Sequence, residues 1–302
     1  MNKTLWIAGE LLVDLIGQEI RDSLFRTHTF RRYAGGSPAN LAANLSRLGH
    51  SVQLVAAVGQ DGLGDYLVHE AERLGVGTAH VQRIAQTPTS MVLLSRSHET
   101  PEFIAYRGAD AHLEPAAFPY EQLKGAGLFH CTCFALSLAP ARETLKRAAE
   151  TAHAFGVPIS LDMNYAPSIW PDRAEARQFV AHWCQLGAWV KVSLDDCRRL
   201  FGEDIQEEEA IAQLLTWGAG LVCFTKGSAG SRLKSAHEDV SVPAEPVHIL
   251  GEATGAGDAF WSGFLSAYLR GAGAAEALRS GGKMAALKLS IDGPMPEKVS
   301  LD

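Results

Sequence analysis

Strand-like and helix-like segments alternate along most of this chain, and no other feature limits its fold as strongly. Apolar runs of strand length end in glycine or polar residues, and the segments between them place apolar residues three or four positions apart, as helices do. The expected strands cover 5–8, 52–58, 127–133, 158–163, 189–193 and 221–225, and the expected helices cover 38–48, 66–74, 141–155, 173–186, 207–217 and 260–269. This order predicts an α/β fold, a doubly wound and mostly parallel sheet flanked by helices, with ligands at the carboxyl ends of its strands.

Two regions interrupt this alternation. Residues 11–16 and 25–33, and again 90–95 and 103–107, have strand-like patterns without a helix between them. We expect them to form a small β-sheet lid, with strands from about 11–34 and 88–108, and edge hairpins of the main sheet are the alternative. Neither a repeat nor a low-complexity linker divides the chain, so we predict a single domain over 1–302 with the lid inserted in it.

Composition limits the ligands and the compartment. The net charge of −7 gives no general attraction to nucleic acid or to an anionic membrane, so an anionic ligand must be held by local groups. Five cysteines without a Cys-x-x-Cys pair are typical of free thiols in a reducing compartment, so we expect the cytoplasm. The N-terminal apolar run is too short for a signal peptide, and no run is long enough to span a bilayer. The eleven histidines lack metal-ligand spacing, which argues against a metal-centred hydrolase.

The segment 252–260 combines small residues with one carboxylate at the start of an expected helix. Gly255, Ala256 and Gly257 carry almost no side chain, so their N–H groups can point at an anion, and the helix adds the positive end of its dipole. Asp258 would repel phosphate, so it is better explained as a base that takes a proton from an attacking hydroxyl. An ordinary capping aspartate beside closely packed glycines is the alternative.

A second glycine-rich segment precedes the helix expected at 38–48. Gly35 and Gly36 let a ligand approach the backbone, and the amide of Asn40 can donate to and accept from the hydroxyls of a sugar. Taken alone, this segment is better explained by a tight turn before a helix. The chain contains no Gly-x-x-x-x-Gly-Lys-Ser/Thr, which excludes a P-loop kinase and leaves phosphate to the 255–257 segment.

These two segments, in this order, resemble both signatures of the PfkB family of carbohydrate kinases, the ribokinase-like group. Further segments are similar to those of bacterial fructokinases: 9–14, 106–110, 162–164, 170–171, 191–193 and 225–230. The resemblance implies a ribokinase-like α/β domain with a β-sheet lid. It also implies transfer of the γ-phosphoryl group of ATP to a primary hydroxyl, with Mg²⁺ as cofactor, and a homodimer formed through the lid.

The resemblance implies roles for particular residues. The general base is Asp258, and the anion hole consists of the backbone amides of Gly255, Ala256 and Gly257. The residues implied to bind the sugar are Asp14, Gly35, Gly36, Asn40, Arg107 and Asn164. The residues implied to bind the nucleotide are Lys191, Ser193, Thr225, Lys226, Gly227 and Gly230. Without the surrounding motifs, Asp14 would be interpreted as a solvated turn carboxylate and Arg107 as a surface arginine.

The chain departs from the family pattern at four positions. Glu252 replaces an aspartate that helps to bind a monovalent cation, and its longer side chain argues against K⁺ activation without excluding it. Asp196 replaces a glutamate, so we expect it to reach Mg²⁺ through water. Ala166 lacks the arginine common in fructokinases, and Lys191 offers a compensating charge. Gly282 stands where the family contacts adenine, which leaves the nucleotide preference open.

The most specific function that these patterns predict is an ATP-dependent ketose kinase, which would convert fructose to fructose 6-phosphate. Its partners would be a small-molecule sugar and ATP. A kinase for ribose, a nucleoside or a 2-keto-3-deoxy sugar acid is an alternative, and so is a catalytically weak sugar-binding protein of the same fold. Asp258 beside an anion hole argues against a pure binder, which needs no proton acceptor there.

Overall fold

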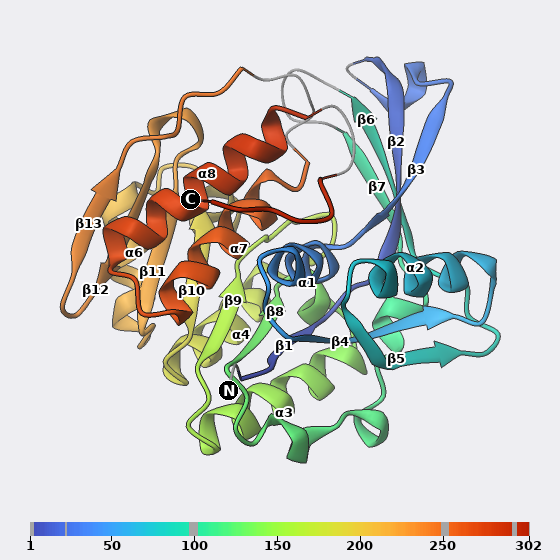
Figure 1. Cartoon of the computed structure of the whole chain (residues 1–302), viewed down its shortest axis with the longest axis horizontal. Coiled ribbons are helices and arrows are strands. Elements are labelled where there is room, and N and C mark those ends of the chain that lie inside the picture. Colours follow the sequence, from blue (N-terminus) through green and yellow to red (C-terminus); the bar gives the residue numbers. More distant parts are fainter. Residues whose placement is uncertain (1–2, 22, 97–101, 249–253, 292–294, 302) are drawn as a thin grey trace.

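A nine-stranded sheet forms the centre of the computed structural model, which describes residues 3–21, 23–96, 102–248, 254–291 and 295–301 (Figure 1). Its strand order is β13-β12-β11-β10-β9-β8-β1-β4-β5, with parallel pairing from β11 to β5 and antiparallel pairing of β12 and β13. The strands are β1 Leu5–Ala8, β4 Val52–Gly59, β5 Gly77–Ile84, β8 Leu128–Thr132, β9 Ile159–Asp162, β10 Trp189–Ser193, β11 Leu221–Thr225, β12 Ser231–Ser235 and β13 Asp239–Val242. The predicted doubly wound, mostly parallel sheet is therefore confirmed.

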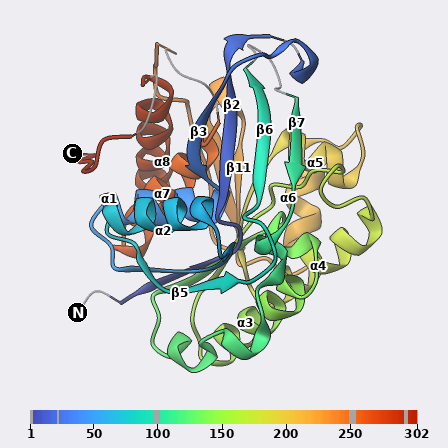
Figure 2. The same cartoon turned by 90° about the vertical axis from the view of Figure 1, so that its right-hand side faces the viewer.

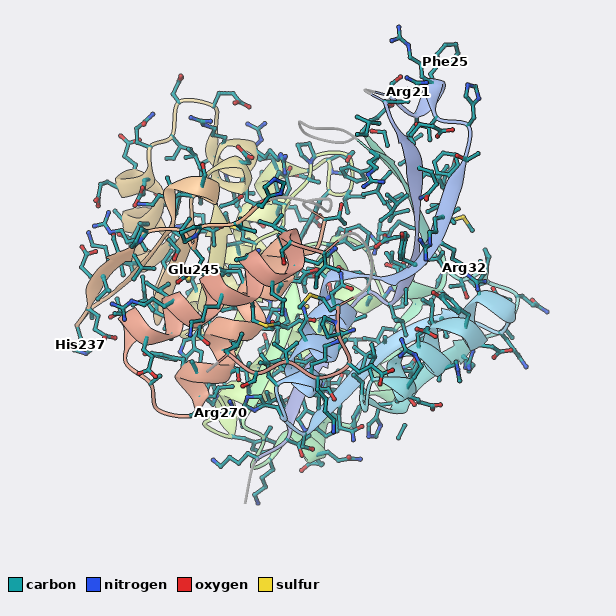
Figure 3. All side chains as sticks on the ribbon, turned by 45° about the horizontal axis from the view of Figure 1, so that its top comes forward. Arg21, Phe25, Arg32, His237, Glu245 and Arg270 are labelled. Carbon is teal, nitrogen blue, oxygen red and sulfur yellow. The ribbon has the colours of Figure 1, made fainter. Side chains whose placement is uncertain are left out.

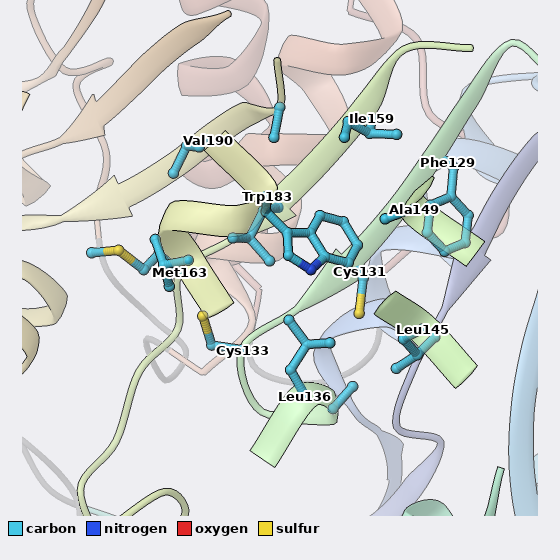
Figure 4. Close-up of a cluster of buried hydrophobic side chains, with 14 of the residues drawn as sticks. Phe129, Cys131, Cys133, Leu136, Leu145, Ala149, Ile159, Met163, Trp183 and Val190 are labelled. Atoms are coloured by element: carbon cyan, nitrogen blue, oxygen red, sulfur yellow. The ribbon is translucent and has the colours of Figure 1, made fainter. Parts of the chain in front are cut away.

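Helices cover both faces of this sheet, as a parallel sheet requires (Figure 1). One face carries α1 Ser37–Arg47, α2 Gly62–Arg73, α7 Ala256–Leu269 and α8 Ala274–Leu289. The other carries α3 Ala141–Ala154, α4 Arg173–Gln185, α5 Leu194–Phe201 and α6 Glu207–Thr216. Each face has its own core; in the second, Trp183 stacks on Phe129 with ring centroids 6.0 Å apart (Figure 4). None of the described helices has the length and apolarity needed to cross a bilayer.

A separate four-stranded sheet stands above the main sheet and forms the lid (Figure 2). Its order is β3-β2-β6-β7, with β2 and β6 parallel and the outer pairs antiparallel. The strands are β2 Leu12–Ile20, β3 Phe30–Gly35, β6 Met91–Arg96 and β7 Phe103–Tyr106. The lid confirms the prediction of a small separate sheet. The strand expected from residue 25 begins only at Phe30, because Leu24–Arg26 form a 3₁₀ turn. The loop 97–101 lies outside the described residues.

The sequence patterns missed five of the described α-helices and β-strands, and they placed the starts of α2 and α7 too late. Helix α2 begins at Gly62, four residues earlier than expected, because the Asp61 carboxylate accepts hydrogen bonds from the N–H groups of Leu63 and Gly64 at 3.0 and 2.8 Å. The missed elements are β5, β12, β13, α5 and α8. The pair Gly281–Gly282 would be expected to interrupt a helix, but it lies inside α8. A Cβ at Gly281 would lie 2.9 Å from the carbonyl oxygen of Phe260 in α7. Close packing on α7 therefore explains that glycine.

Candidate active site

Asp258 lies in the first turn of α7, where its carboxylate meets the first turn of α1. The hydroxyl of Ser37 donates to Oδ1 at 2.7 Å, and the amide of Asn40 donates to Oδ2 at 2.9 Å. The two glycine-rich segments are thus neighbours in space although more than two hundred residues separate them. Both carboxylate oxygens are held by neutral donors, which fix the orientation of the acid without adding a charge.

The start of α7 is suited to an anion. Gly255 adopts a left-handed conformation with φ +80°, and the hydrogen bond from the N–H of Ala259 to its carbonyl opens the helix at 2.9 Å. The N–H groups that precede Ala259 therefore have no carbonyl of α7 to bind, as at every helix N-terminus. Together with the helix dipole they attract negative charge at this point.

A buried lysine lies directly beneath these amides. Lys191 of β10 donates to both oxygens of Asp162 at 3.0 and 2.8 Å, and a Cβ at Gly257 would stand 3.0 Å from its Nζ. Burial by itself lowers the pKa of Lys191, but the nearby carboxylates of Asp162, Asp196 and Asp258 outweigh this and raise the pKa. The structure therefore holds an ammonium ion next to the N-terminus of α7.

Glu10 orients the first turn of α1 from below. Its side chain is 2% exposed and accepts hydrogen bonds from the Ser37 N–H at 3.2 Å and from the Thr132 hydroxyl at 2.8 Å. Burial is the main cause that raises the pKa of Glu10 to about 8. Gly36, with φ +99°, passes so close that a Cβ there would lie 2.3 Å from the carbonyl oxygen of Glu10. No other residue type fits this turn without moving the backbone.

One cleft opens on the lid side of the helix end that carries Asp258, although Asp258 itself is not among its lining residues. It has a volume of about 330 Å³, and Asp14, Asn40 and Gly255 are among its lining residues. Asp14 of β2 lies over Gly35, where a Cβ would come within 2.0 Å of its carboxylate. Predicted sugar-binding residues from two separate segments thus line one cleft.

A second cleft opens on the other side of the same helix end. It has a volume of about 690 Å³ and is lined by Thr225, Gly227 and Gly230, by small apolar residues of α8, and by Ala256 and Gly257. Gly282 of α8 lines it as well. Glu245 is the charged residue among those that line it, and the other walls are mostly small or apolar, which leaves room for a flat nucleobase. The N-terminal turn of α7 separates the two clefts: Gly255 lines the first, and Ala256 and Gly257 line the second.

Two predicted sugar-binding residues are bonded within the protein instead. The guanidinium of Arg107 donates to Asp110 at 2.6 Å and to the Ser137 hydroxyl at 2.8 Å, and it lies over the ring of Phe134 at 4.2 Å. Asn164 accepts from the backbone N–H of Phe134 at 3.2 Å. Neither residue lines either of the two clefts. Both hold the segment around Phe134 in place.

The polar nucleotide-site candidates also have partners within the protein. Ser193 caps α5 by donating to Asp196 at 2.6 Å and accepting from its N–H at 3.1 Å. The Nζ of Lys226 lies 3.5 Å from Glu207. These contacts stabilise the ends of α5 and α6.

The carboxylates available for a metal are few. Asp196 is buried, and its Oδ2 accepts hydrogen bonds from the N–H and the hydroxyl of Ser193. Within the described ranges, no group of three His, Cys, Asp or Glu side chains is arranged to hold a metal ion. Glu252 lies outside those ranges.

Three site residues were not assigned a role from the sequence. They are Glu10, Ser37 and Asp162, which orient α1, Asp258 and Lys191 respectively. A carboxylate at or just after the end of a buried strand was the available signal for Asp162 and Glu10. Ser37 had only its place at the start of a helix.

The chain is similar to kinases over nearly its whole length. Residues 2–298 match the model of the pfkB family carbohydrate kinases. An ATP-dependent 6-phosphofructokinase of Thermoanaerobacterium thermosaccharolyticum is 32% identical over 97% of this chain and 90% of that protein. Fructokinase-1 of Oryza sativa is 32% identical over 85% of this chain and 80% of that protein. A 5-dehydro-2-deoxygluconokinase of Geobacillus kaustophilus is 27% identical over 85% and 79%.

Solved structures show the same similarity to sugar kinases. The fructokinase of Halothermothrix orenii superimposes with a TM-score of 0.81 at 33% identity, covering 92% of this chain and 97% of that one. An E. coli protein assigned as ribokinase II, in complex with ATP and Mg²⁺, superimposes with a TM-score of 0.86 at 26% identity, covering 98% and 95%. The protein therefore belongs to the PfkB family of carbohydrate kinases.

Proposed function

We propose that this protein is an ATP-dependent kinase that transfers the γ-phosphoryl group to a primary hydroxyl of a ketose, with fructose to fructose 6-phosphate as the first reaction to test. The observation that carries the proposal is the position of Asp258 at the helix end between two clefts, one lined by Asp14 and Asn40 and one lined by glycines and small apolar residues. A sugar in the first cleft and ATP in the second would bring the hydroxyl and the γ-phosphorus together there.

In this mechanism Asp258 accepts the proton of the attacking hydroxyl. A bond forms between that oxygen and the γ-phosphorus, the bond from the γ-phosphorus to the β–γ bridging oxygen breaks, and ADP leaves with the electron pair. Ser37 and Asn40 keep the carboxylate directed at the hydroxyl. Bound Mg²⁺ would neutralise charge on the phosphates.

The anion hole has two sources of positive charge in this proposal. The amides of Gly255, Ala256 and Gly257 face the transferring group, and the ammonium of Lys191 lies beneath them. Such preorganised charge is most effective when it meets charge that develops in the transition state. The buried ammonium also supplies a fixed cation at this helix end, which supports activity without K⁺.

The other candidate residues divide into two groups. Asp14, Gly35, Gly36 and Asn40 are proposed to contact the sugar. Arg107 and Asn164 are proposed to position the wall around Phe134. The nucleotide is proposed to lie along Thr225, Gly227 and Gly230, with Ser193 and Lys226 at its edge and Lys191 beneath its phosphates.

The lid is proposed to form the contact of a homodimer. Five of the large hydrophobic side chains that are exposed belong to it: Ile20, Phe25, Phe30, Ile104 and Tyr106. Exposed apolar surface of this kind is typical of an interface. The five cysteines are buried and free, which supports a reducing compartment and therefore the cytoplasm.

A coupled ADP-release assay with hexoses, pentoses, nucleosides and sugar acids at saturating MgATP tests the function. Asp258→Asn should lower kcat by about 10²–10⁴-fold, because the isosteric amide cannot accept the proton. Asp195→Asn, on the exposed side of α5, is the matched control and should leave kcat unchanged. Near-full turnover by a folded Asp258→Asn variant would refute the mechanism. Calorimetric sugar binding without ADP release from any acceptor would favour the sugar-binding alternative.

A further inference from the structure

The cleft beside Asp14 continues away from the catalytic helix end as a groove between α1, α2 and β3. We call it the basic groove, because five basic residues line it against two acidic ones, in a chain whose net charge is −7. The basic residues are Arg31, Arg32, Arg47, Arg73 and Lys288. Neutral sugars need hydroxyl-binding groups and not an excess of cations, so this lining requires a separate explanation.

Among the residues that the structure describes, Arg73 is the only one of these five cations that pairs with carboxylates. Arg73 pairs with Glu70 at 2.9 Å and with Glu297 at 2.6 Å. The other acidic lining residue is Asp14, at the end of the groove where the sugar hydroxyls are proposed to bind. Within the described ranges, the other four cations have no carboxylate partner, so the lining of the groove has an excess of positive charge.

Arg47 and Lys288 are the half-buried cations of this set. Nη1 of Arg47 donates to Asn44 at 2.8 Å, but its buried Nε has no hydrogen-bond partner among the described residues. Burial lowers the pKa of Arg47, and the charge of Arg73 lowers it further. The Cε of Lys288 lies 3.7 Å from where a Cβ of Gly255 would stand, next to the N-terminus of α7. An anion in the groove would relieve the repulsion among these groups.

The lid supplies the other two cations. Arg32 lies over the ring of Tyr66 at 3.8 Å, and Arg31 lies 5.4 Å from the ring centroid of Tyr33. Figure 3 shows Arg32 where the lid meets α2. Aromatic rings hold these guanidinium groups in place without neutralising them, and a planar guanidinium binds an oxyanion through two parallel N–H groups.

We propose that the basic groove binds an oxyanion substituent on the acceptor, so that the preferred substrate is a sugar phosphate or a sugar acid rather than a neutral ketose. This inference rests on the proposed function and narrows its acceptor. The hydroxyl to be phosphorylated would lie at Asp14 and Asp258, and the anionic group at the other end of the molecule would lie among Arg32, Arg47 and Lys288. The chemistry of phosphoryl transfer is unchanged.

The test compares acceptors that differ in an anionic group: fructose, fructose 6-phosphate, fructose 1-phosphate and a 2-keto-3-deoxy sugar acid. With the native protein, at least one anionic acceptor should have a kcat/KM at least about tenfold above that of fructose, since one charge-assisted hydrogen bond alone accounts for such a factor. The acceptor with the highest kcat/KM shows whether the groove prefers a phosphate or a carboxylate. Equal kcat/KM for fructose and every anionic acceptor would overturn the inference and leave the proposed function intact.

Variants of the lining residues test whether the basic groove causes the preference for an anionic acceptor. Arg32→Gln with Lys288→Gln should raise KM for the anionic acceptor by about tenfold or more and leave KM for ATP unchanged. Arg279→Gln, an exposed cation of α8 that does not line the groove, is the matched control. Unchanged KM in the double variant would overturn the inference. If ADP is released with none of the acceptors, the proposed function fails. Calorimetric binding of fructose 6-phosphate then tests anion binding in the basic groove. Weaker binding by the double variant than by the native protein supports the inference, and equal binding refutes it.

Discussion

The amide of Asn40 donates a 2.9 Å hydrogen bond to the carboxylate of Asp258, and this contact joins the N-termini of α1 and α7. Two helix dipoles therefore converge on one acid, together with the hydroxyl of Ser37 on its other oxygen. The two hydrogen bonds fix the orientation of the carboxylate and leave the amides of α7 available to phosphate. Each half of this arrangement is an ordinary helix start, and the function we propose depends on their contact.

Replacing that amide by a second acid tests the contact. Asn40→Asp would place two carboxylates in hydrogen-bond contact, so that one of them must hold a proton at neutral pH. We expect kcat to fall by about 10²-fold or more at pH 7 and the pH–rate profile to shift to higher pH. Gln60→Asp, at an exposed position directly after β4, is the control for an added carboxylate. A profile identical to that of the native protein would show that Asn40 does not contact the general base.

The buried pair Lys191–Asp162 should matter for stability as well as for phosphate. Lys191→Met leaves Asp162, which is 2% exposed, without its partner, and we expect a loss of about 3–5 kcal/mol in the free energy of unfolding. The double variant Lys191→Met with Asp162→Leu removes both charges and should recover much of that stability without recovering activity. Urea denaturation measures the first effect and the ADP assay the second. Full activity in the double variant would exclude a role for the ammonium in the anion hole.

Gly36 should tolerate no side chain. In Gly36→Ala, the new Cβ would meet the carbonyl of Glu10 at 2.3 Å in a backbone with φ +99°, so we expect both lower stability and displacement of Ser37 from Asp258. Gly62→Ala is the matched control, because a Cβ at this first residue of α2 has no heavy atom within 4 Å. Thermal unfolding should separate the two variants. Equal melting temperatures would contradict the packing described for this turn.

Glu10 makes the stability depend on pH in a defined direction. Its pKa is raised from 4.5 to about 8 by burial, so the folded protein holds a proton that the unfolded chain has released between these values. Its contribution to stability is therefore greatest below about pH 4.5 and decreases as the pH rises to about 8. Glu10→Gln does not titrate, so the stability of the native protein minus that of the variant should fall over this range. Urea denaturation at a series of pH values gives that difference, and a pH-independent difference would argue against a buried, protonated Glu10.

The lid surface should control association. Phe25 is 93% exposed and Ile104 is 43% exposed, so Phe25→Ser with Ile104→Lys removes apolar area and adds charge at the proposed interface. We expect the native protein to be a dimer in light scattering and the double variant to be a monomer. Phe155→Ser changes an exposed aromatic on the far side of the main sheet and serves as the control. A native protein that is monomeric at micromolar concentration would contradict the proposed dimer.

The amino-acid sequence alone predicts the α/β class, the approximate extent of the strands from β1 to β11 apart from β5, and the two glycine-rich segments. These features are local: a buried strand, an amphipathic helix and a turn each leave their pattern within about ten residues. The edge strands β5 and β13 were missed because few of their side chains are buried, so neither has a buried apolar run. Helix α8 was missed because only its packing on α7 explains its glycines.

The assembly of the site depends on tertiary contacts that no sequence pattern indicates. The contact of Asn40 with Asp258, the ammonium of Lys191 under Gly257, and the basic groove each join segments far apart in the chain. A local sequence pattern cannot indicate such contacts, because they arise when α1 packs against α7 on one face of the sheet. The motifs could therefore indicate a phosphate site, while the charge and shape of the acceptor site came from the fold.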